Sequence, residues 1–142
     1  MVSEDELILE RLMLLRDEVA YLKKERASVG GFHDYREGRR LRRAVERSLQ
    51  VAVEACLDIG RRIISTQGFR YPETNQEVFR ILAEEAVIPR TLLPALEDMA
   101  RFRNLIVHDY ARIDDASVYA ILTKRLGDFT AFATAVHAWL EG

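Results

Sequence analysis

The sequence predicts an all-α fold, an up-and-down helical bundle of about five helices that forms one domain over residues 1–142. Three observations lead to this fold class. Apolar residues recur at every third or fourth position over long segments, which is the pattern of helices with one buried face. No segment alternates apolar and polar residues over a useful length. The chain also has only 3 prolines and 7 glycines, which argues against a β-sandwich or barrel.

Two long helices are expected in the first half of the chain. The first spans about residues 5–27 and stops near Gly30 and Gly31. The second spans about residues 34–66, and Gly68 is its stop signal. Their apolar stripes are Ile8, Leu12, Leu15, Val19 and Leu22, and then Leu41, Val45, Leu49, Ala52, Cys56, Ile59 and Ile63. Because these helices offer more apolar surface than one small bundle covers, the pattern indicates a homodimer.

Three shorter helices follow. The third begins near Thr74, where Thr74 and Glu77 have the spacing of a capping box, and it ends before Pro89. The fourth starts around Arg90, and the fifth begins near Asp114, a residue type that caps helix N-termini. Their stripes are Leu92, Leu96, Met99 and Ile106 in the fourth helix, and Val118, Leu122, Leu126, Phe129, Ala133, Val136 and Leu140 in the fifth.

Composition narrows the function and the setting. The net charge of -2 excludes a molecule that binds nucleic acid by its overall charge, so such a role requires a local basic patch. Cys56 is the only cysteine, so no internal disulfide can form and a reducing compartment is expected. The acidic start and the lack of a long apolar run predict neither a signal peptide nor a membrane span. We therefore expect a cytoplasmic protein.

No metal and no cofactor are expected. His33, His108 and His137 lie far apart in the chain, and no set of histidines, cysteines and acids has the spacing of a zinc or di-iron site. A glycine-rich phosphate loop is also lacking, so we do not expect this chain to bind ATP through such a loop.

The segment RFRNLIVHDY, residues 101–110, carries the most informative pattern. Arg103 falls in phase with the apolar stripe of the fourth helix, so it should be paired or face a cleft. Tyr110 lies on nearly the same face, whereas His108 is about 140° away on a regular helix. Either the helix deforms before His108, or the Arg103 side chain reaches around it, or a second copy of the chain completes the site.

An arginine and a histidine in one cleft suit metal-free cleavage of RNA. The histidine can deprotonate a 2′-hydroxyl, which then attacks the adjacent phosphorus. The arginine can hold the phosphate and stabilise its transition state, and Asn104 can orient either the phosphate or the imidazole. The alternative is structural, with the histidine capping carbonyls and the arginine paired with a carboxylate. On spacing alone, the structural role is the commoner one.

The motif resembles a known family. Arg103, His108 and Tyr110 form the pattern R-x4-H-x-Y, with Asn104 directly after the arginine. The flanking segments YPETNQEVFRILAEEAVIP and RIDDASVYAIL, and the order of long helices, are also similar. Over nearly its whole length, the chain resembles the HepT family of bacterial toxins, within the HEPN superfamily.

The resemblance implies a function and partners. HepT-like proteins are helical homodimers in which arginine and histidine from both subunits line a cleft, and they are metal-independent endoribonucleases. Arg103 and His108 would then be catalytic. A minimal nucleotidyltransferase antitoxin, MntA-like, would transfer AMP from ATP to Tyr110, and the added charge would oppose an RNA phosphate. The alternative is a catalytically silent helical adaptor that binds a nucleotidyltransferase.

A basic stripe precedes these features. Arg36, Arg40, Arg43 and Arg47 share one face of the expected second helix. They can track an RNA backbone or dock an acidic antitoxin. The alternative is a solvated face with intrahelical pairs, such as Arg42 or Arg43 with Glu46.

Overall fold

The computed structural model describes residues 2–142, and the described chain is helical without strands. Its α-helices are α1 (Glu4–Ser28), α2 (Phe32–Glu37), α3 (Arg39–Gln67), α4 (Asn75–Glu84), α5 (Leu93–His108), α6 (Asp115–Lys124) and α7 (Leu126–Glu141). Two 3-10 turns, η1 (Arg90–Leu92) and η2 (Tyr110–Arg112), flank α5. The all-α prediction is confirmed, whereas the expected number of helices was too low.

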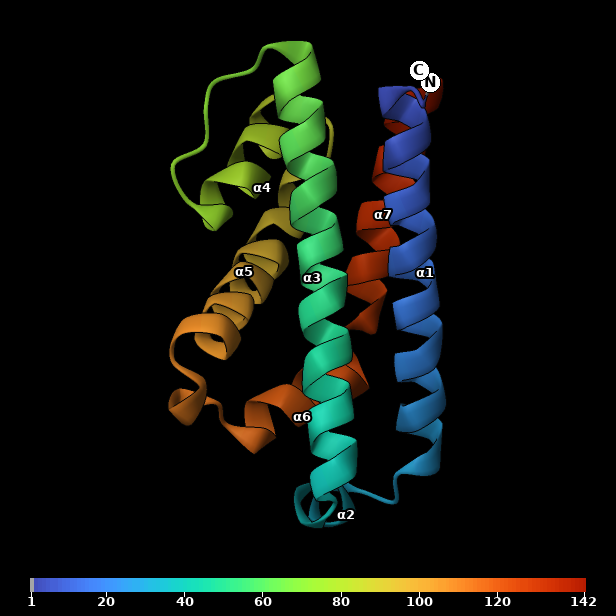
Figure 1. The fold of residues 1–142 in the computed structure, drawn as a ribbon, viewed down its shortest axis with the longest axis vertical. Helices are drawn as coiled ribbons and strands as arrows, with labels where there is room; N and C mark the ends of the chain where they lie inside the picture. Colours follow the sequence, from blue (N-terminus) through green and yellow to red (C-terminus); the bar gives the residue numbers. More distant parts are fainter. Residues whose placement is uncertain (1) are drawn as a thin grey trace.

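The helices pack around α3, the longest of them (Figure 1). α1 runs antiparallel beside α3, and α7 returns along α1 so that the two chain ends lie at the same end of the molecule. α4 and α5 cover another side of α3, and α2 and α6 lie near its N-terminal end. The helices that carry the motif therefore rest on α3 and not on α1.

The predicted stripes form the core. All five stripe residues of the first helix are buried, as are Leu49, Ile59 and Ile63 of α3. Phe79 of α4 and Phe132 of α7 meet edge to face with their ring centres 6.0 Å apart. Each fully buried side chain of this size contributes about 1.5–3 kcal/mol through the hydrophobic effect, so this core holds the scaffold together.

Side chains cap the N-termini of α4 and α6, at the residues where the sequence predicts a helix start. The Thr74 side chain accepts a hydrogen bond from the Glu77 N–H at 3.1 Å, and the Glu77 carboxylate accepts one from the Glu73 N–H at 2.8 Å. Asp114 caps α6 by accepting from the Ala116 N–H at 3.3 Å. The predicted N-caps at Thr74 and Asp114 are therefore confirmed, whereas Glu77 bonds the Glu73 N–H and not the Thr74 N–H that a full capping box requires.

Two expected helices are each broken by one residue. Gly38, with φ -89° and ψ 86°, separates α2 from α3, so the helix predicted over residues 34–66 is wrong as a single element. Arg125, with φ -124° and ψ 7°, separates α6 from α7. Across Arg125 the apolar stripe continues from Leu122 to Leu126, whereas the stripe of the second predicted helix begins at Leu41, after the break at Gly38.

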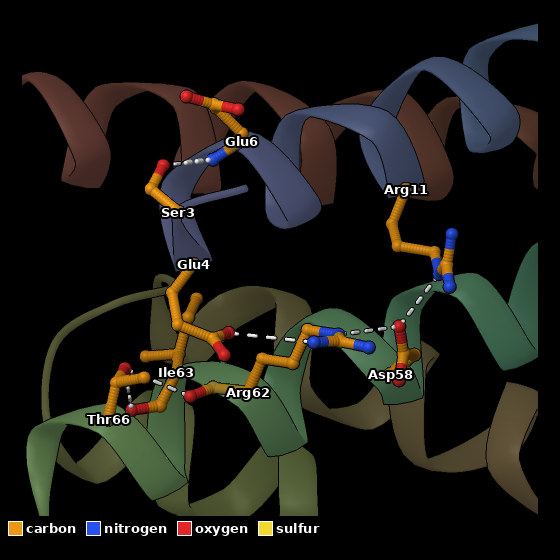
Figure 2. Close-up of polar contacts among 8 residues, drawn as sticks. All are labelled: Ser3, Glu4, Glu6, Arg11, Asp58, Arg62, Ile63 and Thr66. Atoms are coloured by element: carbon orange, nitrogen blue, oxygen red, sulfur yellow. Dashed lines mark hydrogen bonds and ion pairs between the residues drawn. The ribbon is translucent and has the colours of Figure 1, made fainter. Parts of the chain in front are cut away.

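Polar contacts tie α1 to α3 near the chain ends (Figure 2). The Asp58 carboxylate of α3 accepts from Arg11 of α1 at 2.9 Å and from Arg62 at 3.0 Å. Arg62 also lies 3.5 Å from the Glu4 carboxylate. Because these side chains are partly exposed, each pair adds little to stability, and the contacts mainly fix the alignment of the two helices.

None of the helices within residues 2–142 has the length and hydropathy that a membrane span requires.

Gly60 marks the close approach of α3 and α4. A Cβ at this position would lie 2.6 Å from Cγ1 of Val78, so Gly60→Ala is expected to force the helices apart. Overpacking costs about 1–3 kcal/mol, against a gain in helix propensity of about 1 kcal/mol. Thermal unfolding should therefore show a melting temperature lowered by a few degrees.

Gly127→Ala is the matched control, since nothing lies within 4 Å of a Cβ there. Its melting temperature should stay unchanged or rise slightly. Equal melting temperatures for the two variants would contradict the close packing of α3 on α4.

Candidate functional site

The motif divides between the last turns of α5 and the turn after it. α5 begins with Pro94 in its first turn, a position where the missing N–H costs nothing. It ends at His108, because Asp109 leaves the helical region at φ -153° and ψ 56°. Tyr110 therefore lies on η2, not on α5. The expectation that Arg103 and Tyr110 share a face of one helix is wrong for this reason.

Arg103 is paired, as its place on the apolar stripe requires. Its Nε donates to Oε2 of Glu54 on α3 at 3.1 Å, and its side chain is 23% exposed. The Gln50 amide also donates to Glu54, at 3.3 Å. The expectation that Arg103 is paired or faces a cleft is confirmed as a pair, with a partner that the sequence did not identify.

Asn104 joins Arg103 to α4. Its Oδ1 accepts from Nδ2 of Asn75 at 2.9 Å and lies 3.5 Å from Nη1 of Arg103. Asn75 in turn accepts from Nη2 of Arg61 on α3 at 2.9 Å. These bonds link α3, α4 and α5 through polar side chains, and they hold Asn104 in one orientation.

His108 stands at the exposed C-terminal end of α5. Together with Asn104, Arg61 and Arg101 it lines a groove of about 600 Å³ that also includes residues 73–76. Within the described residues, its imidazole makes no hydrogen bond, so it caps no carbonyl there. The histidine is thus free to meet a ligand, in a groove that Arg61, Arg101 and the carboxylate of Glu73 also line.

Tyr110 is held by a buried acid. Its hydroxyl donates a hydrogen bond to Oε1 of Glu46 on α3, and Glu46 is only 6% exposed. The hydrogen bond to Glu46, then burial and then the charge of Glu46 raise the pKa of Tyr110 above its ordinary value. Tyr110 as a whole is 49% exposed, so its hydroxyl is hydrogen-bonded while much of the residue remains accessible to solvent.

Tyr110 also borders a second hollow, of about 280 Å³. Its other lining residues are Arg42, Arg43, Glu46, Ala111, Ile113 and Asp115. Arg103 lines neither this hollow nor the groove of His108. A single copy of residues 2–142 therefore brings Arg103, His108 and Tyr110 near one end of α5 without gathering them in one cavity.

The basic stripe is shorter than expected. Arg36 lies on α2, and the break at Gly38 separates it from Arg40, Arg43 and Arg47 on α3. These three are exposed. The proposed pairs of Arg42 or Arg43 with Glu46 are wrong, because within the described residues Glu46 bonds Tyr110, and Arg42 lies 3.8 Å from Asp115.

The remaining candidate groups are the cysteine and the possible metal ligands. Cys56 is buried, as its place on the apolar stripe predicts, and this burial raises the pKa of its thiol. Within residues 2–142, no three histidines, cysteines or acids gather in a group that could hold a metal ion.

A signal for the missed partners is present in the sequence. Glu46, Gln50, Glu54 and Asp58 recur at every fourth position of α3, so they form a polar row beside the apolar stripe. Three of them contact Tyr110, Arg103 and Arg11. Buried or half-buried acids in such a row need cationic or donor partners, which periodicity alone cannot name.

Comparison with known proteins identifies relatives across most of the chain. Residues 15–136 match the family described as "Ribonuclease HepT-like". A Shewanella oneidensis protein named mRNA nuclease HepT is 28% identical over 117 residues, which cover 82% of this chain and 88% of that protein. An Aphanizomenon flos-aquae protein named tRNA nuclease HepT is 27% identical over 142 residues, which cover 99% and 95%.

Solved structures share the fold. The tri-AMPylated Shewanella oneidensis HEPN toxin, solved in complex with MNT antitoxin, matches with a TM-score of 0.85 at 24% identity, over 94% of this chain and 98% of that chain. YutE, a cytosolic Bacillus subtilis protein of unknown function, matches with a TM-score of 0.83 at 19% identity, over 96% and 90%. The HEPN-like fold predicted from the sequence is thus confirmed.

The contact between Tyr110 and Glu46 has a measurable consequence. Glu46→Gln removes the charge that holds the phenolic proton, so the pKa of Tyr110 is expected to fall toward its ordinary value. NMR titration of the Tyr110 ring resonances measures this. Because the folded pKa is raised, the stabilisation is present at neutral pH and is lost as the pH rises through that pKa. An unchanged Tyr110 pKa would contradict the contact.

Proposed function

The chain belongs to the HepT-like ribonuclease family, and we propose that it is the toxin of a bacterial toxin–antitoxin pair. In this proposal it is a metal-independent endoribonuclease that uses Arg103 and His108. A minimal nucleotidyltransferase of the MntA kind neutralises it by transferring AMP to Tyr110. The observation that carries the proposal is the intact motif on α5 and η2. Its imidazole is exposed and unbonded within the described residues, in a groove that Arg61 and Arg101 also line.

The chemistry needs a base and a cation. The neutral His108 imidazole takes the proton of a 2′-hydroxyl, whose oxygen attacks the adjacent phosphorus. The bond from phosphorus to the 5′-oxygen breaks, leaving a 2′,3′-cyclic phosphate and a 5′-hydroxyl end. The Arg103 guanidinium stabilises the negative charge that grows on the phosphoryl oxygens.

The ion pair of Arg103 is compatible with this role. Glu54 receives the Nε–H, and Asn104 lies within 3.5 Å of Nη1. Within the described residues Nη2 has no partner, so this end of the guanidinium can donate to a phosphate. Glu54 then orients the guanidinium, and the network through Asn104 and Asn75 fixes its plane.

A homodimer would complete the site. Arg103 and His108 project from different sides of α5 and share no cavity in one copy of the described chain. The family resemblance implies a cleft between two copies that is lined by both pairs of residues. We propose this arrangement, because it supplies the common cavity that the chemistry needs.

Neutralisation at Tyr110 has a physical basis. The phenol is half exposed and belongs to the motif, and a phosphodiester on it adds negative charge and bulk beside the site. The related Shewanella oneidensis toxin is tri-AMPylated in the structure that contains its MNT antitoxin, which supports a nucleotidyltransferase partner. The lone, buried Cys56 fits action in the reducing cytoplasm.

Loss of the base tests the enzymatic proposal. His108→Ala is expected to lower RNA cleavage by about 100-fold or more and to relieve growth inhibition in cells that lack the antitoxin. His33→Ala, a change of the same kind at an exposed position on α2, should keep full activity. If the His108 variant cleaves RNA and inhibits growth like the unmodified protein, the catalytic role fails and the adaptor alternative is favoured.

The basic face of α3 tests the RNA contact. Arg40→Gln with Arg47→Gln removes two exposed charges and keeps Arg43, which borders the hollow of Tyr110. RNA affinity should fall, and the slope of log K against log salt should become shallower by up to about 0.7 per lost phosphate contact. Unchanged RNA binding, with weaker binding of the nucleotidyltransferase, would assign this face to the antitoxin.

A further inference from the structure

The hollow beside Tyr110 contains a proton acceptor together with the proposed AMP acceptor. Glu46 on α3 is almost completely buried, yet its Oε1 receives the hydrogen bond of the Tyr110 hydroxyl. The two residues are 64 positions apart in the chain, so the fold brings them together. A buried carboxylate is costly unless it is paired, and here its hydrogen-bond partner is this phenol.

We infer that Glu46 is the general base for the modification of Tyr110. As the Tyr110 oxygen attacks the α-phosphorus of a nucleoside triphosphate held by the partner enzyme, the phenolic proton passes to Oε1 of Glu46. The new bond joins Oη to the α-phosphorus, and the bond from that phosphorus to the bridging oxygen of pyrophosphate breaks. Pyrophosphate leaves with the electron pair, and Glu46 returns its proton to water. This inference rests on the proposed role of Tyr110 as AMP acceptor.

The phenol needs such a base. Its pKa is raised above the ordinary value, chiefly by the hydrogen bond to Glu46, so at neutral pH the hydroxyl stays protonated until the attack. A phenol that forms a bond to phosphorus becomes strongly acidic, and the group that already accepts its proton is the natural receiver. The distance to be crossed is that of an existing hydrogen bond.

The other charged residues that line this hollow, and the nearby Tyr35, do not replace Glu46. Arg42 and Arg43 carry no basic lone pair at neutral pH, and Asp115 on α6 lies against Arg42. Tyr35 on α2 is fully buried, and within the described residues its hydroxyl has no hydrogen-bond partner. Glu46 is therefore the base that this hollow offers.

The two arginines complement the base. The charges of Arg43 and Arg42 lower the pKa of Tyr110, against the effect of Glu46. They therefore stabilise negative charge at the place where the α-phosphate would arrive. The hollow holds two guanidinium groups and two carboxylates, and one of these, Asp115, lies 3.8 Å from Arg42. Glu46 is left to take the phenolic proton as a phosphoryl group approaches the arginines.

The test compares rates of AMP incorporation. The unmodified chain, Glu46→Gln and Tyr35→Phe are each incubated with the partner nucleotidyltransferase and magnesium ATP, and intact mass and peptide mapping follow AMP at Tyr110. Glu46→Gln should lower the initial rate by about 100-fold, and Glu46→Asp should recover part of it. Tyr35→Phe, which removes an unbonded hydroxyl beside Glu46, should stay within about twofold of the unmodified chain.

The pH dependence of the AMP incorporation rate shows whether Glu46 acts as a general base or only supports the structure. Without Glu46, attack depends on ionisation of the phenol, so the deficit of Glu46→Gln should shrink as the pH rises. A deficit that is constant with pH would mean that Glu46 only holds the fold, and an equal rate would mean that the transferase supplies the base; either result overturns the inference. If the unmodified chain takes no AMP at Tyr110, the acceptor assignment itself fails and the inference fails with it.

Discussion

Arg103 lies on the apolar stripe of α5, so its charge needs a partner. The polar contacts that join α3, α4 and α5 follow from this requirement. Glu54 of α3 receives the Arg103 Nε at 3.1 Å, and Asn104 approaches Nη1. Asn75 and Arg61 extend the chain of contacts to α4 and back to α3. The partly exposed ion pair is worth at most about 1 kcal/mol, less than one buried leucine. Its value therefore lies in the orientation of a guanidinium and not in stability.

α3 uses two neighbouring faces, one to pack the core and one to contact the motif residues. Its buried face packs mainly against α1 and α4, whereas Glu46 and Glu54 of its polar row reach the motif. Glu46 aims Tyr110 and Glu54 aims Arg103, so one rigid helix sets the positions of two of the three motif residues. His108 is left to the free end of α5, where its imidazole meets the groove. One central helix therefore fixes the positions of Tyr110 and Arg103, although a single copy of the described chain has no cavity that all three motif residues share.

Much of the fold follows from patterns that act within a few residues. The stripe of α1, the capping signals at Thr74 and Asp114 and the pairing of Arg103 were all predictable from spacing and desolvation. The break at Arg125 was not, because the apolar stripe passes through it. The break at Gly38 was not, because a single glycine within a helical pattern is tolerated. Glu46 and Glu54 were missed because they meet their partners across 64 and 49 positions, and the departure of Tyr110 from α5 depends on one dihedral change at Asp109. Periodicity carries no information about such tertiary contacts.

The chemistry of the RNA ends is the sharpest test of catalysis by Arg103 and His108. Total bacterial RNA is incubated with the purified chain, free of AMP, in excess EDTA, and the new ends are analysed. If His108 and Arg103 activate a 2′-hydroxyl, cleavage proceeds and leaves 2′,3′-cyclic phosphate and 5′-hydroxyl ends, and a 2′-deoxy substitution at the cleaved position stops it. Absence of cleavage by the unmodified chain, or ends that carry a 3′-hydroxyl, would contradict this mechanism.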